Sequence, residues 1–344
     1  MKILVTGAAG FIGAGVMSAL AGRGDAVVGL DSINAYYDVR LKYARLAECG
    51  FTDRAALESG VPVRSASFAD CRFVRMDVTD RQALEALFAA ERFDKVVHLA
   101  AQAGIRHGIV APYDYVGSNL TGFVGILEAC RRHGVKHLVY ASSSSVYGLN
   151  GKADCRESDR TDRPASLYAA TKKADELLAH SYCALFGFAC TGLRFFTVYG
   201  PWGRPDMSPT LFASAILRDE PVRLFNRGEM VRDFTYIDDI VAGTVAALDR
   251  FPEPNEDGLP YRIYNLGCGA PVKVSDFVSR LAGALGKKAK TEELPVQPGE
   301  VLRVGADTRL LEAETGFRPR VSLDEGLGRF VEWYLSEKNP LHRS

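Results

Sequence analysis

The 344-residue chain lacks an excess of charge of either sign, because 42 Lys and Arg residues are balanced by 42 Asp and Glu residues. Without a global basic field nothing attracts nucleic acid or an anionic membrane surface, so neither is expected as a partner. An anionic small ligand must instead be bound by a few charged or polar groups within its binding site. No apolar run reaches the length of about 20 residues that a membrane-spanning helix needs.

A cysteine framework is also missing. The seven cysteines are odd in number and no two are spaced as Cys-x-x-Cys, which argues against disulfides and against a structural zinc site. No metal site is predicted, and seven free thiols suit a reducing compartment, so a cytoplasmic location is expected. The N-terminus loosely resembles a signal peptide, but three glycines and a charged turn at 23–25 favour a strand, a turn and a helix.

What the sequence does contain is an alternation of short apolar runs and longer helical patterns. The runs are β-branched and apolar on both sides, which is typical of a parallel sheet covered on both faces. The alternation therefore predicts an α/β fold with a Rossmann-type, doubly wound parallel sheet. Strands are predicted at 2–6, 26–31, 72–76, 95–100, 137–142 and 189–195, and helices at 11–21, 80–90, 116–132 and 167–186.

The pattern of predicted elements changes after residue 200. Three prolines mark a loop at 200–209. We expect residues 1–198, with a return segment at about 234–268, to form the Rossmann domain. A smaller α/β lobe, from 199–233 and 269–344, is expected at the open end of the sheet, where such folds bind ligands. Helices are predicted at 211–218 and 274–285, a strand at 222–225, and a loop with one short helix at 48–70.

The first predicted strand ends in a turn of the form G-x-x-G-x-x-G. Gly7 permits a tight turn, Gly10 lets the backbone approach a pyrophosphate, and Gly13 lets the following helix pack close to the sheet. The N-terminus of that helix offers free N–H groups and the positive end of its dipole to phosphates. A glycine triplet by itself is also compatible with an ordinary strand-to-helix turn.

Asp31 strengthens the prediction of a dinucleotide site. It ends the second strand, 18 residues after Gly13, where a carboxylate can bind the ribose hydroxyls of adenosine. Because a carboxylate repels a 2′-phosphate, NAD is favoured over NADP. Asp77 and Val78, after the third strand, can meet the adenine. The predicted cofactor contacts also include Phe11 and Ile12 in the turn and Leu99, Ala100 and Ala101 after the fourth strand.

A candidate catalytic pair follows in the fourth predicted helix. Tyr168 and Lys172 are four residues apart and therefore share one helix face. A free phenol has a pKa of about 10 and is a poor base at neutral pH, but a neighbouring ammonium favours the phenolate. Four serines at 142–145 end the fifth strand, where a hydroxyl can donate to a substrate oxygen. Each feature alone has a structural alternative, an amphipathic helix or a Ser-rich turn.

Together, the glycine turn, the serine run and the Tyr-Lys pair resemble the extended short-chain dehydrogenase/reductase family, over nearly the whole chain. In that family the catalytic hydroxyl lies four residues before the Tyr of a Val-Tyr-Gly triplet, which implies Ser143. The resemblance also implies that Asn119 helps to position the active site and that Lys172 binds the nicotinamide ribose. A homodimer through the helices 116–132 and 167–186 is implied by the same analogy.

Longer segments resemble the UDP-glucuronate 4-epimerases within that family. They are 30–42, 100–106, 194–206 and 232–239. This resemblance implies a UDP-sugar substrate, NAD-dependent inversion at C4 through a transient 4-keto sugar, and contact between Arg232 and the UDP phosphates. The pattern departs at Ser32, Glu300 and Arg303, on the uracil and phosphate side.

The carboxylate of a glucuronate imposes a further requirement. The 4-keto intermediate is a β-keto acid and loses CO₂ if the carboxylate stands perpendicular to the ketone plane, so an epimerase must hold this group. Thr197 and Arg204, with Ser144 or Ser145, are the predicted contacts, since Arg offers a fork that matches a carboxylate. Arg106 is a further substrate candidate. The structural alternatives are a salt bridge within the loop for Arg204 and a solvated side chain for Arg106.

Related functions fit the sequence less well. Sugar 4,6-dehydratases carry an Asp-Glu pair after the catalytic Thr, where Ser144 and Ser145 stand here. UDP-glucuronate decarboxylases typically have Asn in place of Thr197, and a UDP-glucose 4-epimerase leaves Arg204 unexplained. A non-catalytic NAD-binding protein need not retain the catalytic hydroxyl, phenol and ammonium together.

Overall fold

The structure, a computed structural model, describes all residues of the chain except 151, 153, 297–300 and 343–344. An eight-stranded sheet forms its centre, with strand order β12-β7-β6-β5-β1-β2-β4-β3. All neighbours are parallel except β3 and β4 at one edge. The strands are β1 (Lys2–Thr6), β2 (Ala26–Asp31), β3 (Val63–Arg64), β4 (Cys71–Arg75), β5 (Lys95–His98), β6 (His137–Ser143), β7 (Ala189–Phe195) and β12 (Tyr261–Leu266).

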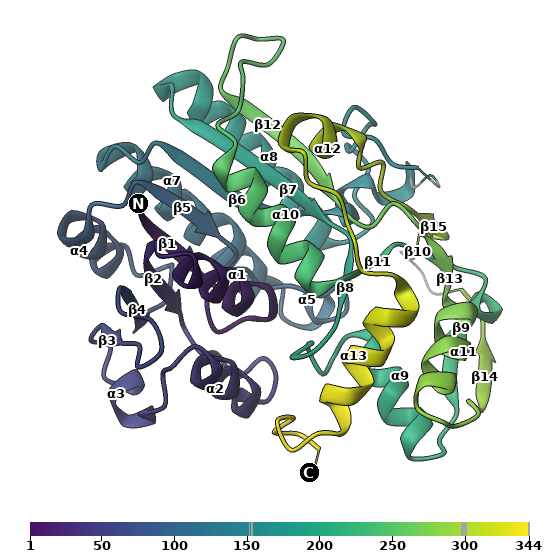
Figure 1. The fold of residues 1–344 in the computed structure, drawn as a ribbon. Coiled ribbons are helices and arrows are strands. Elements are labelled where there is room, and N and C mark those ends of the chain that lie inside the picture. Colours follow the sequence, from purple (N-terminus) through teal and green to yellow (C-terminus); the bar gives the residue numbers. More distant parts are fainter. Residues whose placement is uncertain (151, 153, 297–300, 343–344) are drawn as a thin grey trace.

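Helices cover both faces of this sheet (Figure 1). On one face α1 (Phe11–Gly22) packs beside α10 (Ile237–Asp249), and on the other lie α4 (Arg81–Glu91), α7 (Gly122–Arg132) and α8 (Leu167–Phe186). Successive strand residues point to opposite faces, so Ile3 and Val5 join the core under α1 while Leu4 joins the core under α7. The predicted doubly wound fold is therefore confirmed.

Local sequence signals explain several helix boundaries. Asp80 caps α4 by accepting from Ala83 N at 3.0 Å, and Ser166 caps α8 by accepting from Ala169 N at 3.2 Å. The predicted helix 116–132 is continuous but begins as a π-helix, η1 (Val116–Thr121), before it becomes α7. Such single π turns occur often at functional sites, and this one carries Asn119.

Three local predictions differ from the structure. The strand predicted at 95–100 ends at His98, because Leu99 and Ala100 leave the sheet to line a cavity. Helix α9 (Ser208–Leu217) begins inside the predicted loop. Pro209 lies in its first turn, where the backbone N–H that proline lacks would have no partner within the helix. The region 48–70 holds the expected short helix, α3 (Arg54–Glu58), but also the edge strand β3. Helix α2 (Val39–Glu48) was not predicted.

The rest of the chain forms smaller elements beside the large sheet (Figure 1). Strands β8 (Thr197–Tyr199) and β11 (Phe234–Tyr236) pair, as do β9 (Val222–Phe225) and β14 (Thr291–Leu294), while β13 (Val272–Lys273), β10 (Val231–Arg232) and β15 (Arg303–Val304) form a third sheet. Helices α11 (Val274–Ala284), α12 (Arg309–Thr315) and α13 (Leu323–Leu335) complete this part. Between β11 and β13 along the chain, β12 returns to the large sheet and pairs with β7.

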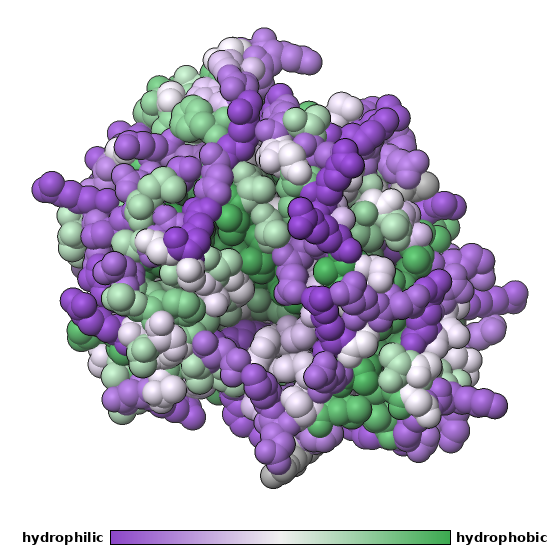
Figure 2. Space-filling view, in the orientation of Figure 1, coloured by the Kyte–Doolittle hydropathy of each residue, from purple (hydrophilic) through white to green (hydrophobic). Residues whose placement is uncertain are grey.

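The surface shown in Figure 2 is mostly hydrophilic, with hydrophobic residues in patches between hydrophilic ones. In the described part of the chain no helix combines the length and the apolar character needed to cross a bilayer. All seven cysteines are free, and six of them are buried.

Candidate functional site

A cavity of about 1370 Å³ lies where strands of the large sheet end. Sites for one small molecule usually measure about 300–1,000 Å³, so this cavity has room for more than one nucleotide-sized ligand. Every residue that the sequence predicted as a cofactor or substrate contact lines it, with the exception of Asn119. The far wall comes from residues 204–232 and from β14 and β15.

The glycine-rich turn forms one end of the cavity. Gly7 has a φ of +72°, and a Cβ there would lie 2.8 Å from Ala100 N, so a side chain would collide with the neighbouring loop. A Cβ at Gly13 would lie 2.0 Å from Gly7 O. Helix α1 follows without a side-chain cap, which leaves its first N–H groups for an anion. The turn thus fits the pyrophosphate of a dinucleotide.

Asp31 is buried at the end of β2, beside this turn. Its carboxylate accepts from Ala9 N at 3.1 Å and from Ile33 N at 2.7 Å, and Lys42 Nζ lies 3.8 Å away. Burial lowers the pKa of Lys42 from its usual value, although the Asp31 charge opposes this. A fixed carboxylate in this place fits a ribose diol. Further along, Val78 is buried, and Asp77 accepts from Thr79 N at 2.9 Å.

The predicted catalytic groups lie together on another wall. Lys172 is buried on α8, where its ammonium donates to Ala141 O and to Asp175 Oδ2, each at 2.9 Å. Tyr168 lies one turn earlier on the same helix face and also lines the cavity. Ser143 ends β6, and its Oγ accepts from Ser145 N at 3.1 Å. A phenol, an ammonium and hydroxyls are therefore gathered in one place.

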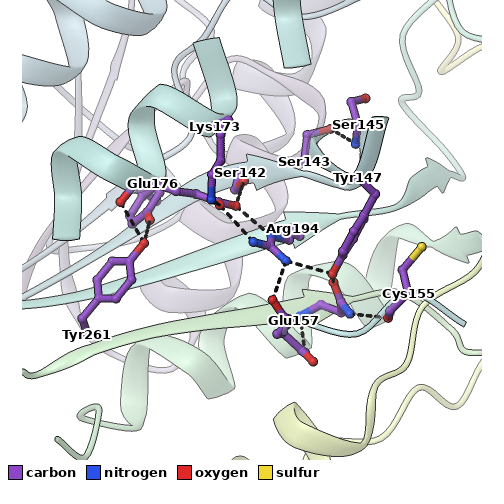
Figure 3. Close-up of polar contacts among 12 residues, drawn as sticks. Ser142, Ser143, Ser145, Tyr147, Cys155, Glu157, Lys173, Glu176, Arg194 and Tyr261 are labelled. Carbon is purple, nitrogen blue, oxygen red and sulfur yellow. Dashed lines mark hydrogen bonds and ion pairs between the residues drawn. The ribbon is translucent and has the colours of Figure 1, made fainter. Parts of the chain in front are cut away.

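Behind this wall lies a buried polar network that the sequence did not reveal (Figure 3). Glu176 accepts from Ser142 Oγ at 2.7 Å, and from Arg194 Nε at 2.8 Å and Nη2 at 2.9 Å. Arg194 also donates to the Tyr147 hydroxyl at 3.0 Å and to Glu157 O at 3.1 Å. Burial raises the pKa of Glu176, but the guanidinium outweighs it, so the net shift is downward. The network ties α8 to the serine-bearing end of β6.

Asn119 lies behind the cavity rather than in its wall. Its side chain is fully buried and donates to Gln102 O at 3.0 Å and to Thr171 Oγ1 at 2.9 Å. Its Oδ1 accepts from Gln102 N at 2.8 Å. These bonds hold the loop after β5 against α8, an arrangement that fits a positioning role rather than direct contact with a cofactor.

Arginines dominate the far wall. Arg204 donates to Asp206 through Nε, at 3.0 Å to Oδ1, and through Nη2, so one edge of its guanidinium is bound to a neighbouring carboxylate. The guanidinium also stacks 5.4 Å from the Tyr36 ring centroid. Arg106 stacks 5.5 Å from the ring centroid of Phe225, and Arg232 Nη1 donates to Val231 O at 2.9 Å. Thr197 lines the cavity at the start of β8.

The model of the NAD dependent epimerase/dehydratase family matches residues 3–267. The chain belongs to this family. It is 47% identical to UDP-glucuronate 4-epimerase 4 of Arabidopsis thaliana, over 98% of this chain and 76% of that protein. It is 43% identical to a probable UDP-glucuronate 4-epimerase of Rhizobium meliloti, over 97% of each chain. The crystal structure of UDP-glucuronic acid 4-epimerase from Bacillus cereus, with UDP-glucuronic acid and NAD, is similar with a TM-score of 0.83 and 33% identity, covering 97% of this chain and 98% of that one.

Within this epimerase family member, sequence reasoning missed several cavity or wall residues. Lys42 went unnoticed because α2 was missed, although the Asp38 cap that begins α2 is a recognisable signal. Glu176 lies four residues after Lys172, a spacing that places both on one helix face. Of the departures from the epimerase pattern, Ser32 lines the cavity, Arg303 opens β15, and Glu300 lies outside the described residues.

Proposed function

We propose that this protein is an NAD-dependent UDP-glucuronate 4-epimerase, which converts UDP-glucuronate to UDP-galacturonate through a transient 4-keto sugar. The observation that carries the proposal is the single cavity in which a dinucleotide turn faces Ser143, Tyr168 and Lys172. The identity to named UDP-glucuronate 4-epimerases over nearly the whole chain supports the choice of sugar.

The described residues fit NAD. The turn from Gly7 to Gly13, including Phe11 and Ile12, receives the pyrophosphate; Asp31 binds the adenosine ribose and disfavours a 2′-phosphate. Asp77 and Val78 border the adenine, and Leu99 to Ala101 face the cofactor with their backbone. When bound there, NAD would supply the hydride acceptor for the sugar C4 and the hydride that is returned to it. Lys172 binds the nicotinamide ribose, while Asn119 holds the loop and helix that frame that site.

The chain's own residues then handle the proton. Tyr168, as phenolate, takes the proton of the sugar 4-hydroxyl and gives it back to the ketone oxygen after the sugar has turned over. Ser143 donates a hydrogen bond to that oxygen while its charge develops. The Lys172 ammonium stabilises the phenolate, because the two groups share one face of α8. No net proton leaves the site in a complete cycle.

The carboxylate of the sugar is held away from the geometry that expels CO₂. Thr197 and Arg204, with Ser144 or Ser145, make these contacts in our proposal, since all four line the cavity. Arg204 Nε and Nη2 already bind Asp206, and we assign Nη1 to the substrate carboxylate. Arg232 contacts the UDP phosphates, and Arg106 lines the same substrate side.

We also propose the larger organisation expected from sequence. Residues 1–198 with 234–268 form the NAD-binding domain, and 199–233 with 269–344 form the nucleotide-sugar lobe. A homodimer through α7 and α8 is supported by the exposed apolar side chains of Leu177 and Leu185 on α8. The free thiols support function in the reducing cytoplasm.

The decisive experiment is NMR of the purified protein incubated with UDP-glucuronate and no added NAD. UDP-galacturonate with little CO₂ is the expected product, and it also shows that the cofactor co-purifies. A UDP-pentose would instead make the protein a decarboxylase and remove the assigned roles of Thr197 and Arg204. Turnover of UDP-glucose alone would move the assignment to a neutral-sugar epimerase.

A further inference from the structure

A buried acid directly behind the catalytic lysine has no role in the reaction described above. Asp175 lies three residues after Lys172 on α8, and both side chains are only 2% exposed. Asp175 Oδ2 accepts a hydrogen bond from Lys172 Nζ at 2.9 Å. The second acceptor of the ammonium is Ala141 O on β6, also at 2.9 Å.

The other oxygen of this carboxylate is unusual. Among the described residues, Asp175 Oδ1 is one of three buried side-chain nitrogen or oxygen atoms that have no hydrogen-bond partner. Leaving a buried carboxylate oxygen unpaired is unfavourable, so such an atom calls for an explanation. Burial raises the pKa of Asp175 to about 6, although the Lys172 charge opposes the shift. The carboxylate is thus retained at a cost to folding.

We propose that Asp175 is a positioning residue: it aims the Lys172 ammonium and offsets part of its charge, and so limits how strongly that ammonium stabilises the Tyr168 phenolate. An ammonium has three N–H bonds. Asp175 and Ala141 accept two of them, which leaves the third for a ligand in the cavity that Lys172 lines. The inference rests on the proposed function, since it assigns Asp175 a part in the same proton transfer.

The surroundings of the pair favour an electrostatic role. His98 on β5 faces Lys172, and burial together with that ammonium lowers the pKa of His98 to about 3, so the ring is neutral at working pH. Glu176 is the other acid near Asp175, but its charge is matched by Arg194 and Lys173. Burial and the Glu176 charge raise the pKa of Tyr140 on β6 and of Tyr261 on β12, so these two phenols near Glu176 are neutral.

The test compares pH profiles of kcat for UDP-glucuronate epimerisation in the wild type and in Asp175→Asn. Without the Asp175 charge, the Lys172 ammonium acts more strongly on Tyr168, so the phenolate is retained to lower pH. The acid limb of the kcat profile, where activity falls with falling pH, should therefore shift to lower pH. Asp175 and Tyr168 are about 10 Å apart along the helix, which gives a shift of about 0.5 to 1 pH unit. A purely structural residue would lower kcat without moving the limb.

Two further variants complete the design. Asp175→Glu keeps the charge and should retain the wild-type limb. Asp257→Asn removes a carboxylate 3.5 Å from His180 of α8, but at the protein surface, and should change nothing. If Asp175→Asn does not fold, Asp175→Ser provides the neutral test with room for a water molecule.

The outcomes separate this inference from the proposed function. A wild type that does not epimerise UDP-glucuronate overturns the function itself. A wild type that does so, with an acid limb that is unchanged in a folded neutral variant, overturns only the role of Asp175. Failure of both neutral variants to fold would also overturn it, because the carboxylate would then serve folding rather than the lysine.

Discussion

The two walls of the cavity are built in different ways. The wall formed by β6 and α8 is backed by a buried polar network, and the side chain of Arg194 on β7, at the centre of that network, is only 4% exposed. The opposite wall presents arginines from loops and short strands, and the side chain of Arg204 there is 16% exposed. Arg194 is bound to Glu176, 18 residues away along the chain, whereas Arg204 is bound to Asp206, two residues away.

This difference follows from what each wall has to do. Proton and hydride transfer require distances fixed to fractions of an ångström, and a misplacement of about 1 Å can lower a rate about a hundredfold. Holding a substrate carboxylate requires an adaptable cation, which a loop can provide. We therefore expect changes in the first wall to abolish activity or folding, and changes in the second to alter substrate handling.

Replacement of Tyr168 by Phe should have the largest effect. The phenol is the only proton acceptor in the proposed step, and a positioned acid–base group contributes about 10²–10⁴-fold, so kcat should fall by that factor. Bound NAD and the unfolding temperature should be unchanged. The measurement is kcat by NMR, with Tyr113→Phe as control, because that ring is exposed at the surface. Retention of normal turnover would remove Tyr168 from the mechanism.

Replacement of Glu176 by Gln tests the buried network itself. Arg194 would remain buried without a countercharge, and breaking such a pair costs about 3–5 kcal/mol of unfolding free energy. The control is Glu58→Gln, which removes an exposed acid paired with Arg54, outside α7 and α8, and should cost far less. Chemical denaturation measures both. Equal losses in the two variants would mean that the network stabilises no more than a surface pair.

Much of the glycine-rich end of the cavity and of the wall formed by β6 and α8 could be predicted, because the residues that define each of them are close together in the sequence. A turn that needs Gly7 and Gly13 tolerates no side chain, and a phenol and ammonium that must share a helix face are four residues apart. Both constraints act within a few residues, so the sequence displays them directly.

The supporting residues could not be predicted, because their partners are distant in sequence. Arg194 meets Glu176 only after β7 has been placed beside β6. Lys42 reaches Asp31 only once α2 has formed, and α2 was not predicted. The position of Asn119 behind the cavity follows from a π-helical turn that periodicity does not reveal.

Replacement of Arg204 by Lys addresses the second wall. Lys keeps the charge, but its single nitrogen cannot bind Asp206 as the Arg204 fork does and also serve the substrate carboxylate. The apparent KM for UDP-glucuronate should therefore rise about tenfold, with more CO₂ released per turnover. Arg160→Lys is a matched control, since Arg160 also binds an acid two residues later, Asp162, but on the exposed surface. Unchanged KM and CO₂ release would leave Arg204 as a loop-stabilising residue, which is its structural alternative.

The smallest expected effect concerns His137, at the opposite end of β6 from Ser143. Its ring bonds Thr191 Oγ1 at 2.9 Å and Leu248 O at 3.2 Å, and burial lowers its pKa to about 4. The unfolded chain takes up this proton near pH 6.5, so the contribution of His137 to stability is full above that pH and is lost as the pH falls toward 4.

Between pH 7 and 5.5 the wild type should therefore lose about 1 kcal/mol more unfolding free energy than His137→Gln, as measured by denaturant titration at each pH. Epimerisation at pH 7.5 should be unaffected, because His137 is not among the residues that line the cavity and its ring bonds Thr191 and Leu248 rather than Glu176 or Arg194. Equal losses in both proteins would show that folding does not change the pKa of His137. A loss of activity would mean that the geometry of the catalytic groups depends on the whole of β6. The contrast between the two walls would then concern entire strands rather than their carboxyl ends.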